Sequence, residues 1–493
     1  MSANRTVRSP ILATIIALTC LSASGCGDTT SKGDTTITAH ASDVTDTADT
    51  RVAHDAAPDA GDPDASENST GLPVIHRADA SLAREGRRLL FEGGLQGPRI
   101  PMRAIRNLWL VWGTGQPADD ADLWREFNHR YGTISTESGQ PPLGVHVDGD
   151  SAEFSCLTCH ADRVAGEVTV GVGNSLLDLE ALYDDLRELR KVASNYGISV
   201  PAFPDEMKAP TGAAGAVDGF GMGMQLSTEY APGDTDIHTR YGYQQAPMWW
   251  TIKFRDRVYT DGASQTGGYR TMMATSLGFG TSIADLKKLD DEFRAVHHYL
   301  LSLEAPGWPF AEPDPASVKR GKALFDRHCA SCHGTHTGPD ARYPNRIEPV
   351  DAVGTDPVRT DQFTQTEASW VNASWIGKEH PMTSTDGYLA PPLVGVWASA
   401  PYFHNGSVPT LAGVLDSSAR PDHWRRTGRT KTDYDPDAVG WRYTVETPRG
   451  RETRAQRRTY DTSTRGLDNR GHTYGDQLDT DERAALLDYL KTL

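Results

Sequence analysis

The pattern of apolar and polar positions predicts an amphipathic helix at the end of each half of the chain. Between residues 286 and 303, apolar side chains recur every three or four positions and therefore share one helix face. They are Leu286, Leu289, Phe293, Val296, Leu300 and Leu303. This helix ends in the sequence HYLLSL, and the chain itself ends in the related sequence DYLKTL at residues 488–493.

Each half also begins with a related segment, so the chain contains an internal repeat. The sequence SLAREGRRLLF at residues 81–91 parallels ASVKRGKALF at residues 316–325, and each contains a glycine, Gly86 or Gly321, that permits close approach of another helix. A proline-rich linker at residues 305–313 separates the halves. We therefore predict two domains, at residues 75–305 and 313–493. In the first domain an insertion rich in aromatic residues separates the first helix from the cysteines, and it contains Trp109, Trp112, Trp124 and Phe127. No strand-rich region is evident, so the predicted fold is mainly α with long ordered loops.

The N-terminus has the features of an export signal. An apolar run at residues 11–21 follows two arginines and has about half of the ~20 residues that span a bilayer. It ends in Ala-Ser-Gly-Cys26, which resembles a bacterial lipoprotein signal. We predict a signal peptide at residues 1–25 and a lipid on Cys26, which places the protein in the periplasm or at the outer membrane. An ordinary secretory signal is the alternative.

Residues 26–72 contain almost no large apolar side chain and are predicted to form a flexible, disordered linker. The 493-residue chain has a net charge of −17, and this linker contributes about half of it. The acidic balance argues against a nucleic-acid partner. A hydrophobic content of 38% excludes a protein with many membrane spans, so the lipid anchor would be the membrane contact.

Four of the six cysteines lie in two C-x-x-C-H motifs, at Cys156, Cys159 and His160 and at Cys329, Cys332 and His333. This spacing attaches haem c, because two thiols form thioethers and the following histidine reaches the iron. A redox dithiol would not need the histidine twice. A zinc site built from four thiolates would leave both histidines without a role, and chance repetition is improbable. The sequence therefore predicts two covalently bound haems.

The second axial ligand decides whether a haem transfers electrons or also binds a small oxidant. For the second haem, His472 lies in a glycine-flanked loop before the closing helix, which suits a ligand, whereas His404 and Met382 are alternatives. His336 lies too close to its motif to reach the opposite face. For the first haem nothing singles out a ligand. Its candidates are Met222, Met224, His238, Met272, Met273, His297 and His298.

Residues 80–493 resemble the dihaem rubber oxygenases and their relatives. The resemblance is carried by VGTDPVR from Val353, YLAPPLVGVW from Tyr388, PYFHNGSVPTL from Pro401 and the glycine-histidine loop at His472. The segment around His404 is also similar to bacterial dihaem cytochrome c peroxidases. Those peroxidases use a methionine ligand a little further on, where this chain reads VLDSS at residues 414–418.

The resemblance implies two cytochrome c-like domains, with His472 as the distal ligand of the second haem and His160 as the proximal ligand of the first. In the family the first haem binds oxygen beside a phenylalanine, with a tryptophan near the route between the haems. Phe279 and Trp249, or its neighbour Trp250, are the candidates for these positions.

The resulting hypothesis is an oxidoreductase whose second haem relays electrons and whose first haem is open to dioxygen or peroxide. Its partners would be a redox protein or the small oxidant, with an apolar substrate if the reaction is an oxygenation. The alternative is a non-catalytic periplasmic electron carrier with two six-coordinate haems, which would dock basic redox proteins through its acidic surface.

Overall fold

The computed structural model describes residues 72–95, 99–193, 195, 197, 214–215, 243–277, 282–447 and 453–493. The signal peptide, Cys26, nearly all of the 26–72 linker and Phe279 lie outside these residues, so those predictions stay predictions. Leu72 is already buried in the core, and the amides of Ile75 and His76 donate to the carbonyl of Lys253.

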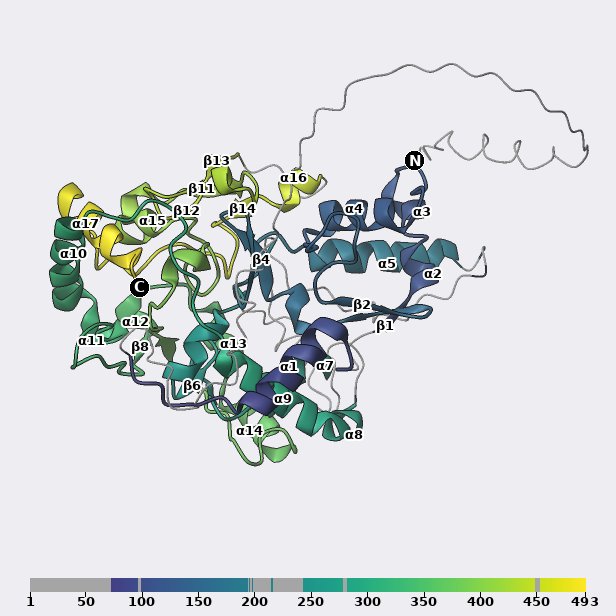
Figure 1. Ribbon diagram of the computed structural model, residues 1–493, viewed down its shortest axis with the longest axis horizontal. Coiled ribbons are helices and arrows are strands. Elements are labelled where there is room, and N and C mark those ends of the chain that lie inside the picture. The colour runs from purple at the N-terminus through teal and green to yellow at the C-terminus, as the bar shows by residue number, and fades with distance from the viewer. Residues whose placement is uncertain are drawn as a thin grey trace, which may run out of the picture. The chain divides into compact units, whose positions relative to one another are not determined.

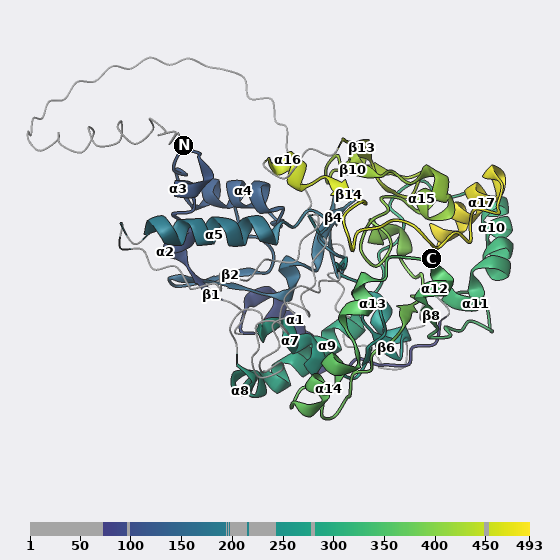
Figure 2. The same ribbon diagram turned by 180° about the vertical axis from the view of Figure 1, so that it is seen from behind.

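The two predicted helix pairs are present, and each pair crosses at its glycine. Helix α1 (Ala80–Glu92) packs against α9 (Asp290–Ser302), and α10 (Pro315–His328) packs against α17 (Thr480–Leu490). Figures 1 and 2 show both pairs side by side. A β-carbon at Gly86 would collide with the carbonyl of Ala295, and one at Gly321 with the carbonyl of Ala485. Glycine is therefore required where the helix backbones touch.

The other helices lie in the segments between these pairs. They are α2 (Met102–Ile105), α3 (Trp109–Trp112), α4 (Asp120–Tyr131), α5 (Leu179–Ala193), α7 (Arg270–Leu277), α8 (Ile283–Leu286), α11 (Ala330–His333), α12 (Val350–Val353), α13 (Val358–Gln362), α14 (Gln365–Ala373), α15 (Leu411–Leu415) and α16 (Arg454–Arg457). Two of the 3₁₀ helices carry residues of the site, η2 (Cys156–Thr158) and η5 (Trp249–Phe254).

The expectation of a mainly α fold is confirmed in part, because the chain is rich in helices but small antiparallel sheets join them. One sheet has the order β1-β3-β2 and another β13-β10-β14, and four further pairs are β4-β5, β6-β7, β8-β9 and β11-β12. The strands are β1 (Arg99–Pro101), β2 (Val145–Asp148), β3 (Ser151–Phe154), β4 (Ala161–Val164), β5 (Glu167–Val170), β6 (Arg257–Val258), β7 (Ser264–Gln265), β8 (Ile347–Pro349), β9 (Gly387–Leu389), β10 (His423–Arg426), β11 (Tyr434–Asp435), β12 (Gly440–Trp441), β13 (Tyr443–Val445) and β14 (Tyr460–Asp461). Strands of two to four residues are too short to show an alternating pattern. The chain is therefore helix-rich but mixed.

The described residues form one large hydrophobic core and a separate one for the insertion. The large core contains residues of both halves, from Leu89 and Phe293 to Phe325 and Tyr489. The second core is built from residues 100–193 alone and includes Trp112, Trp124 and Phe127, three of the aromatic residues that mark the insertion in the sequence.

A buried ionic network links the two halves of the chain. Asp162 on β4 is fully buried, and it accepts hydrogen bonds from Arg426 at 2.8 Å and Arg429 at 2.5 Å. Arg426 Nη1 also donates to Ser175 Oγ at 2.5 Å, and its guanidinium lies over the ring of Trp441. Within the described residues, no helix is long and apolar enough to cross a membrane.

Candidate functional site

The second C-x-x-C-H motif begins where α10 ends, which fixes the direction of its histidine. The amide of Cys329 still donates to the carbonyl of Phe325, and the short helix α11 carries the chain to His333. His333 Nδ1 donates to the carbonyl of Pro391 at 2.8 Å, so its other ring nitrogen is free to bind a metal. Burial lowers the pKa of His333, which keeps the ring neutral as a ligand must be.

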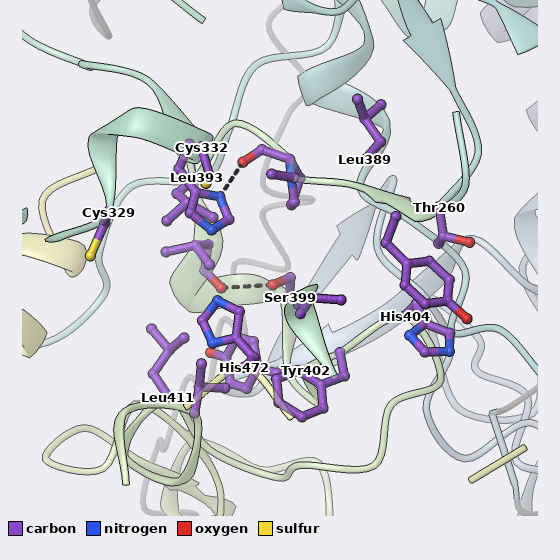
Figure 3. Close-up of a pocket in the computed structure, with 18 of the residues that line it drawn as sticks. Thr260, Cys329, Cys332, Leu389, Leu393, Ser399, Tyr402, His404, Leu411 and His472 are labelled. Atoms are coloured by element: carbon purple, nitrogen blue, oxygen red, sulfur yellow. Dashed lines mark hydrogen bonds between the residues drawn. The ribbon is translucent and has the colours of Figure 1, made fainter. Parts of the chain in front are cut away.

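His472 faces His333 across a gap of the size that one metal ion needs. The ring centroids are 6.2 Å apart, and both residues line the same pocket, in which Figure 3 shows His472. Imidazole nitrogens bind a metal at about 2 Å, so a pair of rings with an ion between them has roughly this separation. His472 Nδ1 is buried without a hydrogen-bond partner, and burial followed by the nearby His333 lowers the pKa of His472 to about 4.

The loop that carries His472 is held in a left-handed backbone conformation. His472 has a φ of 44° and Gly471 a φ of 78°, and a β-carbon at Gly471 would collide with Gly354. The amide of His472 donates to the carbonyl of Val353 at 2.7 Å. The segment VGTDPVR from Val353, which the sequence analysis singled out as part of a family pattern, therefore supports the loop that presents His472.

Arg420 fastens the same loop from the other side. Its guanidinium donates to the carbonyls of Asn469 and Gly471, each at 2.7 Å, and also to that of His472 at 3.2 Å. It lies 4.9 Å from the ring centroid of Phe403. Sequence reasoning missed Arg420, because nothing near it in the chain marks it as a partner of a loop some 50 residues away.

The facing histidines line a cavity of about 390 Å³. Cys329 and Cys332 lie at its wall, and its apolar lining includes Leu389, Leu393 and Leu411. Cys332 Sγ lies 3.1 Å from Glu348 Oε1. Burial raises the pKa of Cys329 to about 12, and both cysteines are free of disulfide bonds, so they remain available as thiols.

The alternative ligands for this site lie elsewhere or point differently. Met382 is buried in the core, with its backbone bonded to the side chain of Asn372, and is not among the residues that line the cavity. His404 lines the cavity but stacks on Tyr388 with ring centroids 4.0 Å apart, and its Nε2 is buried without a partner. His336 accepts the amide of Leu393 and is buried, which gives it a structural role.

The first C-x-x-C-H motif sits in a turn before a hairpin. Cys156 opens η2, and the carbonyls of Cys159 and His160 accept the amides of Asn174 and Gly171 in the residues after β5. His160 Nδ1 is buried without a partner, and burial lowers the pKa of this residue to about 4. The His160 ring stacks on Trp249 with centroids 4.5 Å apart, so these two candidate residues, predicted separately, lie in contact.

The remaining candidates around the first motif have contacts of their own. Trp250 is fully buried and donates to the carbonyl of Val394 at 2.9 Å, which is a packing role. Met273 is buried in the core, and His298 Nδ1 accepts the amide of Asp79 at 2.9 Å. His297 packs near Tyr269, and Met272 packs partly buried against the core. Met222, Met224 and His238 lie outside the described residues.

Two family models match the second half of the chain. Residues 318–391 match the cytochrome c family, and residues 387–425 match the "RoxA-like, cytochrome c-like" family. The first match contains the Cys329, Cys332 and His333 motif, and the second contains His404. The chain is a c-type cytochrome related to the RoxA family. Cytochrome c domains imply covalently bound haem c and a part in electron transfer.

The curated relatives that match are two uncharacterised proteins of Sinorhizobium fredii (strain NBRC 101917 / NGR234). The protein y4iM is 30% identical over 219 residues, which cover 40% of the cytochrome and 48% of the relative. The protein y4iJ is 27% identical over 258 residues, which cover 39% and 41%. The cytochrome thus matches less than half the length of either relative.

Among solved structures, Kuenenia stuttgartiensis hydrazine synthase pressurized with 20 bar xenon aligns over 51% of the cytochrome and 73% of that chain. The TM-score is 0.23 and the sequence identity is 16%. An alignment this loose does not define a common fold.

The residues present fit haem c. The cysteine pair and the histidine of the second motif lie at one cavity, and the ring of His472 lies 6.2 Å from the ring of that histidine with its Nδ1 buried and without a partner. Haem iron supplies one-electron chemistry there, and its potential depends on the axial ligands, on burial and on hydrogen bonds to the ligands. His333 and His472 are suited to the role of axial ligands, because both are buried and His333 is oriented by the carbonyl of Pro391.

Proposed function

We propose that the cytochrome is an exported dihaem oxidoreductase, in which one haem is bound within residues 75–305 and the other within residues 313–493. The facing pair of His333 and His472 is the observation that carries the proposal. Two histidine ligands leave no open position, so this haem would act only as an electron relay.

The first haem, attached at Cys156 and Cys159 with His160 as its ligand, would be the one that reacts with dioxygen or peroxide. The contacts of Met273 and His298 support this assignment, because the first is packed in the core and the second is bonded to Asp79. An open haem needs exactly one strong protein ligand, and His160 is oriented for this role by its stacking on Trp249.

Trp249 would also assist electron transfer between the two sites. Its ring contacts His160, and its neighbour Met248 lines the cavity that contains His333 and His472. Met248 and Trp249 therefore connect His160, the proposed ligand of the first haem, with the wall of the cavity that contains His333 and His472. The substrate would be the oxidant alone or an apolar compound that it oxygenates, and a redox protein would exchange electrons with the relay haem.

Rapid mixing of the fully reduced cytochrome with hydrogen peroxide or dioxygen tests the proposal. The absorption of the haem at His160 is expected to change first, followed by oxidation of the haem at His333 and His472. Replacement of Trp249 by Phe keeps an aromatic ring that can stack on His160, and it is expected to slow the second phase with little effect on the first. Simultaneous slow oxidation of both haems, without a fast first phase, would instead favour a carrier with two six-coordinate haems.

Export and the lipid on Cys26 form a separate part of the proposal. Expression of the full chain in a bacterium, followed by fractionation, is expected to place the cytochrome with the membranes. A Cys26→Ser variant, which cannot receive the lipid, is expected to appear in the soluble periplasmic fraction. Equal distribution of the two proteins would contradict the anchor.

A further inference from the structure

The ring of His472 has no hydrogen bond that would fix its orientation. His472 Nδ1 is buried and has no partner among the described residues, whereas Nδ1 of the facing His333 donates to the carbonyl of Pro391 at 2.8 Å. A hydrogen bond at the second ring nitrogen is the usual means by which a protein orients a histidine ligand. The plane of the His472 ring must therefore be fixed by the side chains that pack against it.

Two aromatic rings lie next to the His472 ring. The ring centroid of Phe403 is 5.9 Å from that of His472, with 56° between the planes. The ring centroid of Tyr474 is 5.1 Å from that of His472, with 86° between the planes. Both separations are in the range of aromatic contacts, and both residues line the cavity that contains His472. Rotation of the imidazole about its side-chain bonds would bring it into collision with these rings.

Phe403 is itself held in an unusual position. Its φ of 69° lies in the left-handed region, which residues with a β-carbon seldom adopt, and its carbonyl accepts the amide of Gly406 at 3.1 Å. The guanidinium of Arg420 lies 4.9 Å from the centroid of the Phe403 ring and also binds the loop carbonyls at Gly471 and His472. Strained conformations of this kind persist where the surrounding structure enforces them. The strain is explained if the Phe403 ring must lie against His472.

Tyr474 holds its place beside His472 although much of its ring is exposed. The residue is 41% exposed, so burial of its own surface is only a partial reason for its position. Its carbonyl accepts a hydrogen bond from Gln477 Nε2 at 3.1 Å, and its hydroxyl donates to the carbonyl of Ala352 at 3.5 Å. These contacts keep the Tyr474 ring at the edge of the cavity, next to the ligand.

The rings of His333 and His472 are held with their planes crossed, at an angle of 61°. Each imidazole ligand donates π electrons into the iron d orbital that lies perpendicular to its own plane. Parallel rings donate into the same orbital and separate its energy from that of its partner, whereas crossed rings donate into both and leave the two close in energy. The angle between the rings therefore decides the electronic structure of an iron bound between them.

We propose that Phe403 and Tyr474 are positioning residues, which hold the ring of His472 crossed to the ring of His333. The inference rests on the proposed relay haem at this cavity. A ligand whose orientation is locked by packing keeps that orientation in the oxidised and the reduced protein. Little rearrangement then accompanies the gain or loss of an electron, which suits a relay.

Electron paramagnetic resonance of the oxidised holoprotein tests the inference. Crossed planes give a strongly anisotropic low-spin signal, whereas parallel planes give a rhombic signal with a smaller maximum g value. We expect the strongly anisotropic signal in the wild type, and its loss in His472→Ala identifies it as that of the relay haem. In a double variant with Phe403→Leu and Tyr474→Leu, the ring can turn toward the parallel arrangement, which a low-spin iron favours. The maximum g value should then fall while the low-spin visible absorption remains.

Two control variants separate the orientation of the ligand from general effects of substitution. Tyr474→Phe keeps the ring and should keep the signal of the wild type. Phe310→Leu also removes a phenylalanine ring, but Phe310 stacks on Tyr434 and is not among the residues that line the cavity, so the signal should again stay the same. If the double variant fails to fold or loses His472 as a ligand, the single variants Phe403→Leu and Tyr474→Leu decide, each with a smaller shift in the same direction.

An unchanged signal in the variants that lack one or both rings would overturn the inference. A rhombic signal from the relay haem of the wild type would also overturn it, because the planes would then not be crossed, as would an equal shift in Phe310→Leu. The absence of any two-histidine signal in the wild type would contradict the proposed function instead. The two failures are therefore distinguishable.

Discussion

At the scale of single residues, His472 is a proposed haem ligand that also has an unfavourable backbone conformation. A φ of 44° is uncommon for a residue with a β-carbon, and such conformations persist where the surrounding structure enforces them. Here the carbonyl of Val353 and the guanidinium of Arg420 hold the residue on both sides. The strain is explained if the imidazole must point at the position opposite His333.

Replacement of His472 by Ala is expected to remove the low-spin, two-histidine spectrum of the second haem. The covalent attachment at Cys329 and Cys332 does not depend on His472, so the haem content should stay the same. Visible absorption of the oxidised and reduced protein measures the change. His423→Ala, a histidine that pairs with Asp461, is the control and should leave the spectrum as in the wild type. An unchanged spectrum in His472→Ala would reject the assignment.

The sequence identified the residues of the site that carry a motif, and it missed those that act through tertiary contacts. The attachment cysteines and their histidines follow from spacing, and His472 follows from a resemblance that the facing rings support. Arg420 could not be found in this way. Its role arises from backbone carbonyls far along the chain, which no local pattern reports.

At the scale of elements, Arg420 connects the helical segment at α15 with the loop of His472. It donates to the carbonyl of Gly413 at 2.8 Å as well as to the loop carbonyls. Arg420→Met is expected to destabilise the loop by at least about 2 kcal/mol, because hydrogen bonds from a charged donor are lost and buried carbonyls remain. The low-spin absorption should then disappear at a lower temperature than the far-ultraviolet circular dichroism.

Arg470 lies in the same loop and provides the matched control. Its side chain is 84% exposed and pairs with Asp468. Arg470→Met should therefore leave the low-spin absorption and the circular dichroism melting together, as in the wild type. If Arg420→Met behaves in the same way, the loop is not held by Arg420.

The helix crossing at Gly321 is the second element whose sequence makes a quantitative prediction. Gly321→Ala is expected to lower the free energy of unfolding by about 1–3 kcal/mol, because the added methyl group meets the backbone of α17. Gly307→Ala is the control, since nothing lies within 4 Å of a β-carbon there. Urea unfolding of the two variant holoproteins measures the free energy of unfolding of each. Equal midpoints for the two variants would mean that α10 and α17 accommodate the added methyl group without loss of stability.

The helices were easier to predict than the strands for a physical reason. Helices α1, α9, α10 and α17 bury an apolar face over three or four turns, and that repetition is visible in the sequence. Strands such as β6 and β11 contain two residues each and form because hairpins and loops bring them together. Their pairing is decided by contacts that a local pattern does not contain.

At the scale of the whole described chain, the buried network around Asp162 joins the first half to the second. Asp162→Asn is expected to destabilise the cytochrome by about 3–5 kcal/mol at neutral pH. The substitution removes the negative charge that compensates the buried guanidinium of Arg426. Glu446→Gln, in the more exposed pair with Arg425, should cost less than about 1 kcal/mol. Urea unfolding at pH 7 measures the difference, and similar effects of the two variants would contradict a linking role.

The same network makes stability depend on pH with a defined sign. Burial raises the pKa of Asp162, but Arg429 and Arg426 outweigh this effect and hold its pKa below the usual value. Its contribution to stability is therefore complete above the unfolded pKa of about 4 and is lost as the pH falls through the lower folded value. The stability difference between the wild type and Asp162→Asn should accordingly shrink below about pH 4, and a constant difference would contradict the lowered pKa.

The two proposed haem sites differ, with histidines on both faces of the second haem and an open face on the first. Electron paramagnetic resonance of the fully oxidised holoprotein tests this difference most directly. We expect one low-spin signal of a haem with two histidine ligands and a second, distinct signal from the haem at His160. Two low-spin signals from six-coordinate haems, or the absence of a two-histidine signal, would contradict it.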